Sequence, residues 1–272
     1  MPNKIYTNIP IEKKSDSANF TKQYFDEYFD KCIKSLKIQK VQFNELLIVH
    51  TTEEQLVEKL KNYDFESLNV KLIPFEGVGN YQSQINLGIE NVSSEWVSFF
   101  EFDDEYSNIW FDNVLKYSEI YSDVDAFLPI VVDVDSKDVF AGFTNEATFA
   151  ANFTQEMGYL NNDTLLDYQN FQTAGMVVKK SKLDEIGPMK SSMKLTFVYE
   201  FLLRLTYFTA RVMTIPKLGY KHTSMREGSI FWNYKNGENV MSENEVKFWI
   251  STAKKEYFFV EDRNIKYEAP SA

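Results

Sequence analysis

The sequence predicts an α/β fold, in which helices flank both faces of a mostly parallel central sheet. Two observations predict this class: short apolar segments alternate with helix-like segments along the first 105 residues, and polar or acidic residues follow the apolar segments. Consecutive parallel strands need a crossover, usually a helix, so this alternation is typical of a parallel sheet. Neither an internal repeat nor a low-complexity linker divides the sequence, and we expect one domain over 1–272.

The first half of the chain predicts four strands separated by helices. Its first helix carries Phe20, Tyr24 and Tyr28 at every fourth residue, the spacing of one helical face. The segment from Leu46 to Val49 is apolar throughout, as in a strand that is buried on both faces. The expected strands are 4–10, 44–50, 70–75 and 96–102, and the expected helices are 19–36, 51–63 and one that ends near residue 91.

The second half is less regular. Gly187 and Pro188 end a short helix, because glycine favours a helix end and proline cannot continue the helix. The aromatic, Asn-rich stretch 136–170 has no clean period and predicts an insertion, and the chain beyond Trp232 predicts a charged, helical tail. The expected strands are 126–134, 173–178 and 212–216, and the expected helices are 181–186 and 197–207.

Composition argues against several classes of protein. The formal net charge is −11, whereas extensive nonspecific DNA binding needs a basic face. The single cysteine, Cys32, lies in a helical pattern and is expected to be a buried small hydrophobe. The sequence has no stretch with the length and apolar character of a signal-peptide core or a membrane span, so we expect a cytoplasmic protein.

An acidic cluster follows the strand predicted at 96–102. Asp103, Asp104 and Glu105 come directly after this strand, and Glu101 is its penultimate residue. Glu101 and Asp103 share one face of the strand, while Asp104 lies past its end and can turn into a cleft. Carboxylates this close repel one another unless a cation or hydrogen-bond donors offset them, and Mg²⁺ and Mn²⁺ take oxygen ligands. The alternative is an acidic loop exposed to water.

The order and spacing of several blocks between residues 25 and 121 resemble family 2-like glycosyltransferases, which have the GT-A fold. Residues 29–36 resemble the helix before the family's second strand, and 44–50 resemble that strand. Residues 80–89, with their Asn-x-Gly-Ile ending, resemble the following helix, and 96–104 resemble the strand that carries the acidic DxD motif. The resemblance therefore implies a Rossmann-like α/β/α sandwich.

The resemblance also implies a nucleotide-sugar donor, expected to be a UDP-sugar, and a Mn²⁺ or Mg²⁺ ion on its diphosphate. In this family the acidic motif contacts the ribose and holds the metal, so the resemblance makes Asp104 the metal ligand. Glu101 and Asp103 become donor-binding residues. His222 stands where related enzymes often present a histidine to the metal or diphosphate, and we expect it to be a second metal ligand.

Three further residues fall in the expected donor site. Thr7 and Pro10 are expected in the base pocket, and His50 stands where the family usually has Asp, so His50 is expected to stack on or hydrogen-bond the base. The resemblance divides the domain into a nucleotide-sugar half at about 1–105, an acceptor half at about 106–235 and a charged, helical tail at 236–272.

The segment from Thr196 to Arg204 resembles the family's acidic pair followed by apolar residues and an arginine, with Tyr199 in place of the first acid. Glu200 then stands where the catalytic base is expected. The alternative is an ion pair between Glu200 and Arg204, one helical turn away. Gly175 resembles the small residue that lines the acceptor side, where it would let the backbone approach the sugar. The implied reaction is an inverting, hexosyltransferase-like single displacement.

The acceptor stays open: a glycan, a protein, a small molecule or a modified nucleobase. One alternative is a non-catalytic relative that binds a nucleotide or glycan, suggested by His50 and Tyr199 in place of acids. Another is a viral glycosyltransferase that acts on modified DNA bases, although the acidic charge counts against it. A sugar-nucleotide-forming nucleotidyltransferase is disfavoured because the first 25 residues contain no glycine for a phosphate loop. A calcium loop at 133–144 lacks the required Gly and Glu.

Overall fold

The structure is a computed structural model that describes residues 5–8, 25–76, 81–146, 159–208, 210–237 and 239–265. Its described strands form one ten-stranded sheet. They are β1 (Ile5–Asn8), β2 (Leu46–Thr51), β3 (Val70–Phe75), β4 (Trp96–Glu101), β5 (Glu105–Tyr106), β6 (Ala126–Val134), β7 (Phe140–Thr144), β8 (Tyr159–Leu160), β9 (Val177–Lys179) and β10 (Val212–Thr223). The main path of the sheet runs β3-β2-β1-β4-β9-β6-β10-β5, with β7 on β6 and β8 on β10.

The predicted parallel sheet is confirmed in the first half of the chain. Strands β3, β2, β1 and β4 are parallel neighbours. In the second half, β6 and β10 are parallel over nine register pairs, while β9 runs antiparallel between β4 and β6. Because β1, β2 and β4 all run the same way, their carboxyl ends meet at one edge, where ligands of open α/β sheets gather.

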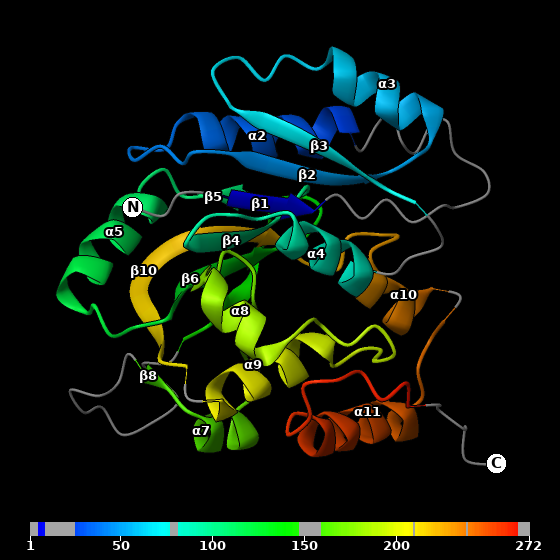
Figure 1. Cartoon of the computed structure of the whole chain (residues 1–272). Coiled ribbons are helices and arrows are strands. Elements are labelled where there is room, and N and C mark those ends of the chain that lie inside the picture. The colour runs from blue at the N-terminus through cyan, green and yellow to red at the C-terminus, as the bar shows by residue number, and fades with distance from the viewer. Residues whose placement is uncertain are drawn as a thin grey trace.

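Helices cover both faces of this sheet, as a sandwich requires. Leu47 and Val49 of β2 lie in the core under α4, α8 and α9, whereas Leu46 and Ile48 lie in the core under α2, α3 and α5. Figure 1 shows α2 and α3 near one end of the molecule and α11 near the other, beside α9. The helices are η1 (Phe25–Phe29), α2 (Asp30–Lys37), α3 (Glu54–Asn62), α4 (Tyr81–Glu90), α5 (Trp110–Ile120), α7 (Asn162–Asp167), α8 (Lys180–Ile186), α9 (Phe197–Tyr207), α10 (Ile230–Asn236) and α11 (Glu243–Glu256).

Two departures from the predicted elements bear on the site. Strand β10 does not end at Pro216 but continues to Thr223, because irregularities between Ile215 and Tyr220 absorb the extra residues within the β6 pairing. Helix α5 was not predicted, and it packs against β10 with Trp110 fully buried. The extension of β10 carries the segment that contains His222 back over the end of β4.

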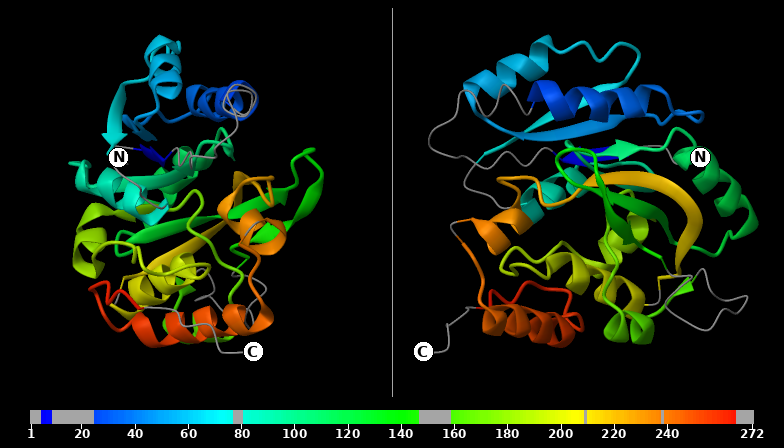
Figure 2. Two further views of the ribbon diagram at one scale, coloured as in Figure 1. Left: turned by 90° about the vertical axis from the view of Figure 1, so that its right-hand side faces the viewer. Right: turned by 180° about the vertical axis from the view of Figure 1, so that it is seen from behind.

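The predicted insertion at 136–170 contains β7, β8 and α7 within its described parts. Figure 2 shows β6 and β7 projecting together beyond the rest of the sheet.

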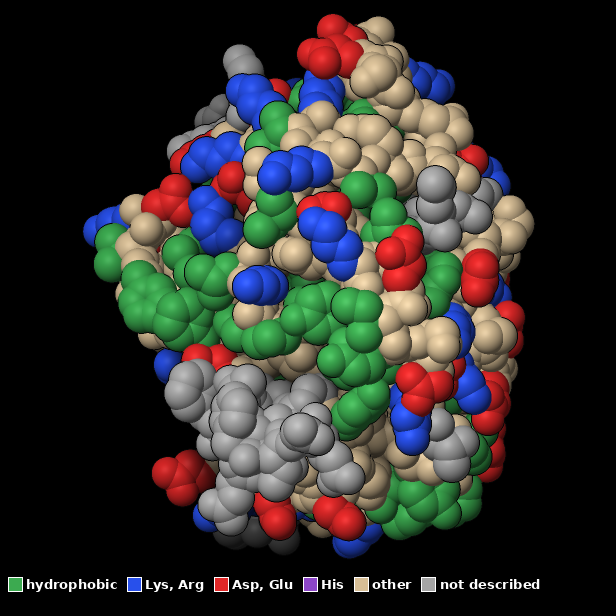
Figure 3. All heavy atoms as spheres, turned by 90° about the vertical axis from the view of Figure 1, so that its left-hand side faces the viewer, with side chains coloured by type: hydrophobic (Ala, Val, Ile, Leu, Met, Phe, Trp, Pro, Cys, Tyr) green, Lys and Arg blue, Asp and Glu red, His purple; other side chains and the backbone are tan. Residues whose placement is uncertain are grey.

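On the face seen in Figure 3, basic and acidic side chains are interspersed around a band of apolar ones. Cys32 is fully buried, as expected. Among the described helices, none combines the length and the apolar character that a membrane span needs.

Candidate active site

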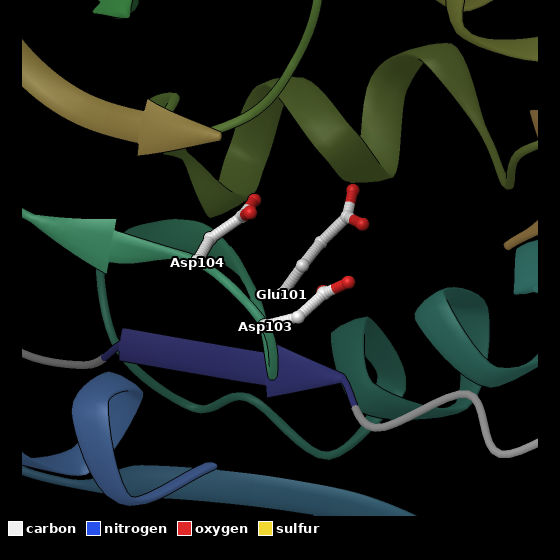
Figure 4. Close-up of side chains that lie close together, drawn as sticks. All are labelled: Glu101, Asp103 and Asp104. Carbon is white, nitrogen blue, oxygen red and sulfur yellow. The ribbon is translucent and has the colours of Figure 1, made fainter. Parts of the chain in front are cut away.

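The predicted acidic cluster lies where the chain leaves β4. Asp104 N donates to Glu101 O at 3.3 Å, which closes a tight turn and brings three side chains together. Carboxyl oxygens of Glu101, Asp103 and Asp104 lie within 4.8 Å of one another. Figure 4 shows the three side chains at this turn, beside the end of β1. The cluster therefore occupies the carboxyl edge of the sheet that the strand order predicts.

Strand β10 is held against this turn by strand pairing and by hydrogen bonds. Tyr220 and Lys221 pair with β5, the short strand that directly follows the turn. Beyond them, Thr223 N donates to Asp104 Oδ1 at 2.8 Å, and Thr223 Oγ1 donates to the carbonyl oxygen of Asp103 at 2.8 Å. These bonds hold the segment around His222 beside the acidic cluster, although more than a hundred residues separate them in sequence.

The three carboxyl groups differ in their partners. Asp103 Oδ2 accepts from Arg226 Nε at 2.5 Å, and the Arg226 guanidinium lies over the ring of Phe102 at 5.1 Å. Glu101 Oε1 accepts from the hydroxyl of Tyr81 at 3.1 Å. Asp104 Oδ2 is buried and has no hydrogen-bond partner among the described residues. A buried carboxylate oxygen without a partner is costly, so Asp104 Oδ2 is open to a proton, a water or a cation.

The pKa shifts within the cluster also indicate that a bound cation would stabilise it. Burial raises the pKa of Asp104 well above its ordinary value; the charge of His222 partly offsets this, and the charges of Asp103 and Glu101 add to it. Burial also raises the pKa of Glu101, which His222 and the Tyr81 hydroxyl partly offset. Both shifts express the cost of holding neighbouring carboxylates charged in a poorly solvated place. A cation bound at the cluster would relieve that cost.

The residues present fit a divalent cation. They provide several carboxylate oxygens, the donor type that Mg²⁺ and Mn²⁺ prefer, and one of these oxygens is otherwise unsatisfied. Asp104 is the best placed of the three to bind it, because the second oxygen of Asp104 is the unsatisfied one. Asp103 already has the Arg226 guanidinium as its counter-ion.

His222 lies on β10 opposite Asp133 of β6, and the imidazole Nδ1 is 2.8 Å from Asp133 Oδ1. Burial alone would lower the pKa of His222, but the negative charges of Asp104, Asp133 and Glu101 raise it to about 10. His222 lies outside the group of carboxyl oxygens within 4.8 Å, yet it lines the same cavity as Glu101 and Asp103. Asp104 does not line the cavity, but its bond from Thr223 N places it beside the residue that follows His222.

This cavity has a volume of about 750 Å³. Its acidic part contains Glu101, Asp103 and Asp133 together with His222 and Arg226. Much of the remaining lining is apolar, and part of it is a wall at the start of α9. The main apolar and aromatic side chains of this lining are Phe143, Phe171, Leu195, Phe197, Val198 and Phe231. A cavity with a polar end and an apolar wall is typical of a small-molecule site.

Glu200 does not reach this cavity. Its side chain is 0% exposed and accepts from Arg204 Nε at 2.9 Å and from Arg204 Nη2 at 3.1 Å. Lys190 Nζ lies 3.0 Å from Glu200 Oε1. The structure therefore favours the ion-pair alternative and removes support for Glu200 as the catalytic base. From α9, the cavity is lined by Phe197, Val198 and Tyr199, whereas Glu200 is held by Arg204 and Lys190.

Gly175 also serves packing and does not line the cavity. Its φ is +72°, and an added Cβ would lie 2.6 Å from Tyr220 Cδ2 and 2.9 Å from Pro129 Cγ. Its carbonyl oxygen accepts from Trp110 Nε1 at 3.0 Å. The expected close approach is therefore to Tyr220 and Pro129 and not to an acceptor sugar.

The predicted base-pocket residues are described only in part. Thr7 lies in β1 with Ile48 and Phe100 as its register partners, and Pro10 lies outside the described residues. His50 lies near the carboxyl end of β2 and is 3% exposed. Its ring atom Nδ1 is 2.8 Å from the carbonyl oxygen of Thr51. It does not line the cavity described above, and its base-binding role stays a prediction.

Sequence reasoning missed Asp133 and Arg226. Asp133 stands near the end of a correctly predicted strand, so its place at the ligand edge of the sheet could have been inferred. Arg226 follows β10 in an irregular segment, and only the fold shows that it meets Asp103. In the sequence, Asp133 stands out only as the first residue of the rejected calcium loop, and Arg226 belongs to no pattern that signals a site.

Comparisons with known proteins agree with this geometry. The family model described as Glycosyl transferase family 2 matches residues 22–184, more than half of the chain. The solved structure of S. aureus TarS 1–349 in complex with UDP-GlcNAc is similar, with a TM-score of 0.59, 18% identity and coverage of 84% of this chain and 60% of that one. The structure of TarS 1–349 in complex with UDP has a TM-score of 0.57 and 16% identity, with coverage of 94% of this chain and 72% of that one.

At these identities the similarity to TarS shows a shared fold, which together with the family match is the GT-A fold. The chain spans less than two thirds of the TarS fragment that carries UDP-GlcNAc. Among curated proteins, no match to the sequence is found.

Proposed function

The chain belongs to glycosyl transferase family 2, and we propose on this premise that it transfers a sugar from a UDP-sugar to an acceptor hydroxyl with the help of Mn²⁺ or Mg²⁺. The observation that carries the proposal is the unsatisfied, buried Oδ2 of Asp104, clustered with Glu101 and Asp103, which line one end of the cavity. The complexes of TarS with UDP-GlcNAc and with UDP supply the expected class of donor.

Each residue of the cluster has a distinct part in this proposal. Asp104 would hold the cation, with His222 as the second ligand, and a bound cation would neutralise charge on the departing diphosphate. Glu101 and Asp103 would contact the donor, and the Arg226 guanidinium keeps Asp103 in place and partly neutralised. The apolar wall at the start of α9 would exclude water from the reacting sugar.

We propose a single displacement with inversion, as the family resemblance implies. Such a step needs a proton acceptor near the incoming hydroxyl. Among the described residues, the carboxylates that line the cavity are Glu101, Asp103 and Asp133, whereas α9 contributes Phe197, Val198 and Tyr199 and no carboxylate. This wall favours a second candidate function, a family member that binds the donor without transferring its sugar.

A screen of UDP-sugars for release of UDP tests the proposal. Each donor is incubated with the protein and Mn²⁺, with and without pools of glycan, protein and small-molecule acceptors. The proposal predicts release that EDTA abolishes and that Asp104→Asn abolishes in a folded protein. Calorimetric binding of UDP with Mn²⁺ but no release from any donor supports the second candidate. Absence of both binding and release contradicts both.

A further inference from the structure

The contact between Asp133 and His222 fixes the state of the imidazole. The parallel register of β6 and β10 sets the two residues opposite each other. A carboxylate oxygen accepts hydrogen bonds, so the 2.8 Å contact between His222 Nδ1 and Asp133 Oδ1 requires the proton on Nδ1. A cation that binds the other ring nitrogen, Nε2, must displace any proton there, whereas Nδ1 keeps its proton on Asp133.

We infer that Asp133 is a positioning residue, which holds the Nδ1–H of His222 and so leaves Nε2 to bind the cation. The inference rests on the proposed function, because that function supplies the cation. A carboxylate on the far nitrogen of a metal-binding histidine sets the tautomer and the ring orientation and makes the ligand more basic. Asp133 is in the correct place for this role, on the strand next to His222 and outside the cluster of Glu101, Asp103 and Asp104.

Asp133 is itself held in place. Its side chain is 14% exposed, and the amide nitrogen of Gln172 lies 3.5 Å from Asp133 Oδ1. The same amide contacts Thr144 of β7, which pairs with β6 beside Asp133. Asp133 Oδ1 thus has both His222 Nδ1 and the Gln172 amide within hydrogen-bond distance, and its side chain is mostly buried.

The test is the affinity for Mn²⁺ alone, measured from the free-ion signal by electron paramagnetic resonance. Asp133→Asn keeps the shape of the side chain but removes its charge, and its amide can either accept from or donate to Nδ1, so it no longer fixes the tautomer. We expect a loss of about 10- to 100-fold in Mn²⁺ affinity, the usual effect of removing such a partner. Asp138→Asn is the matched control: it removes one carboxylate from the same hairpin, where Asp138 pairs with Lys221.

A double-mutant cycle separates positioning from a purely structural effect. If Asp133 acts through His222, Asp133→Asn adds no further loss of Mn²⁺ affinity in a His222→Gln background. Additive losses, or an Asp133→Asn protein that binds Mn²⁺ as the wild type does, overturn the inference and leave the proposed function intact. A wild-type protein that binds no Mn²⁺ overturns both.

A second measurement uses the wild-type chain and needs no altered Asp133. The protein has two histidines, so ¹⁵N NMR of labelled histidine gives two sets of signals, and His222→Gln identifies one set by its disappearance. With Mg²⁺ bound, the inference predicts a protonated Nδ1 and an unprotonated Nε2 in His222. The opposite tautomer would refute it.

Discussion

Replacing Glu200 by Gln distinguishes a structural ion pair from a catalytic base. The substitution keeps the shape of the side chain but removes its charge. In the structure Glu200 is the buried counter-ion of Arg204 and Lys190, both of which have side chains at most 2% exposed. Gln would leave two buried cations without their shared anion and would set an amide group among their donors.

The magnitude follows from burial. Removing one partner of a buried ion pair typically costs about 3–5 kcal/mol, a large part of a total stability of about 5–15 kcal/mol. For a chain of this size each kcal/mol lowers the melting temperature by roughly 2–4 °C, so we expect a decrease of roughly 6–20 °C. Activity per folded molecule should change far less than the roughly 10²- to 10⁴-fold loss expected on removing a general base.

Thermal denaturation followed by circular dichroism, together with UDP release below both transitions, gives the two readouts. Glu243→Gln is the matched control, because it removes the same charge from an i,i+4 pair whose Glu243 side chain is 93% exposed; its melting temperature should not change measurably. A Glu200→Gln protein with wild-type stability and a turnover rate roughly 10²- to 10⁴-fold lower would refute the reasoning and support Glu200 as the base.

Two further substitutions test the site and its support. Gly175→Ala should lower the free energy of unfolding by about 1–3 kcal/mol, because φ is +72° and the new Cβ meets Tyr220 and Pro129. Gly142→Ala is the control: its Cβ would have nothing within 4 Å, so its melting temperature should stay near that of the wild type. Equal effects of the two substitutions would contradict the packing argument. Mn²⁺ should raise the melting temperature of the wild type but not that of Asp104→Asn, since only a bound ligand stabilises the folded state; an equal rise in both would remove Asp104 from the metal site.

The acidic cluster could be predicted from the sequence because its parts are local. Strand β4 and the carboxylates after it are neighbours in the chain, and the rule that ligands gather at the ends of parallel strands places them correctly. The parallel strands of the first half were predictable for the same reason: each is a short apolar block between helices. These elements need no knowledge of distant contacts.

The parts that failed depend on tertiary contacts. Pro216 indicated the end of a strand, but pairing with β6 carries β10 past it to His222. Asp133 and His222 meet only through that pairing. The i,i+4 spacing of Glu200 and Arg204 was visible in the sequence, yet it could not show which side of α9 faces the cavity. Helix orientation is set by what packs against the helix, here α7, α8 and α11.

The central claim is that the carboxylates after β4 hold a divalent ion that in turn binds the diphosphate of a nucleotide. Calorimetric titration of UDP into the wild-type protein, in Mn²⁺ and then in EDTA, tests it most directly. We predict binding in Mn²⁺ that is lost in EDTA. Equally tight binding of UDP in EDTA would contradict the claim.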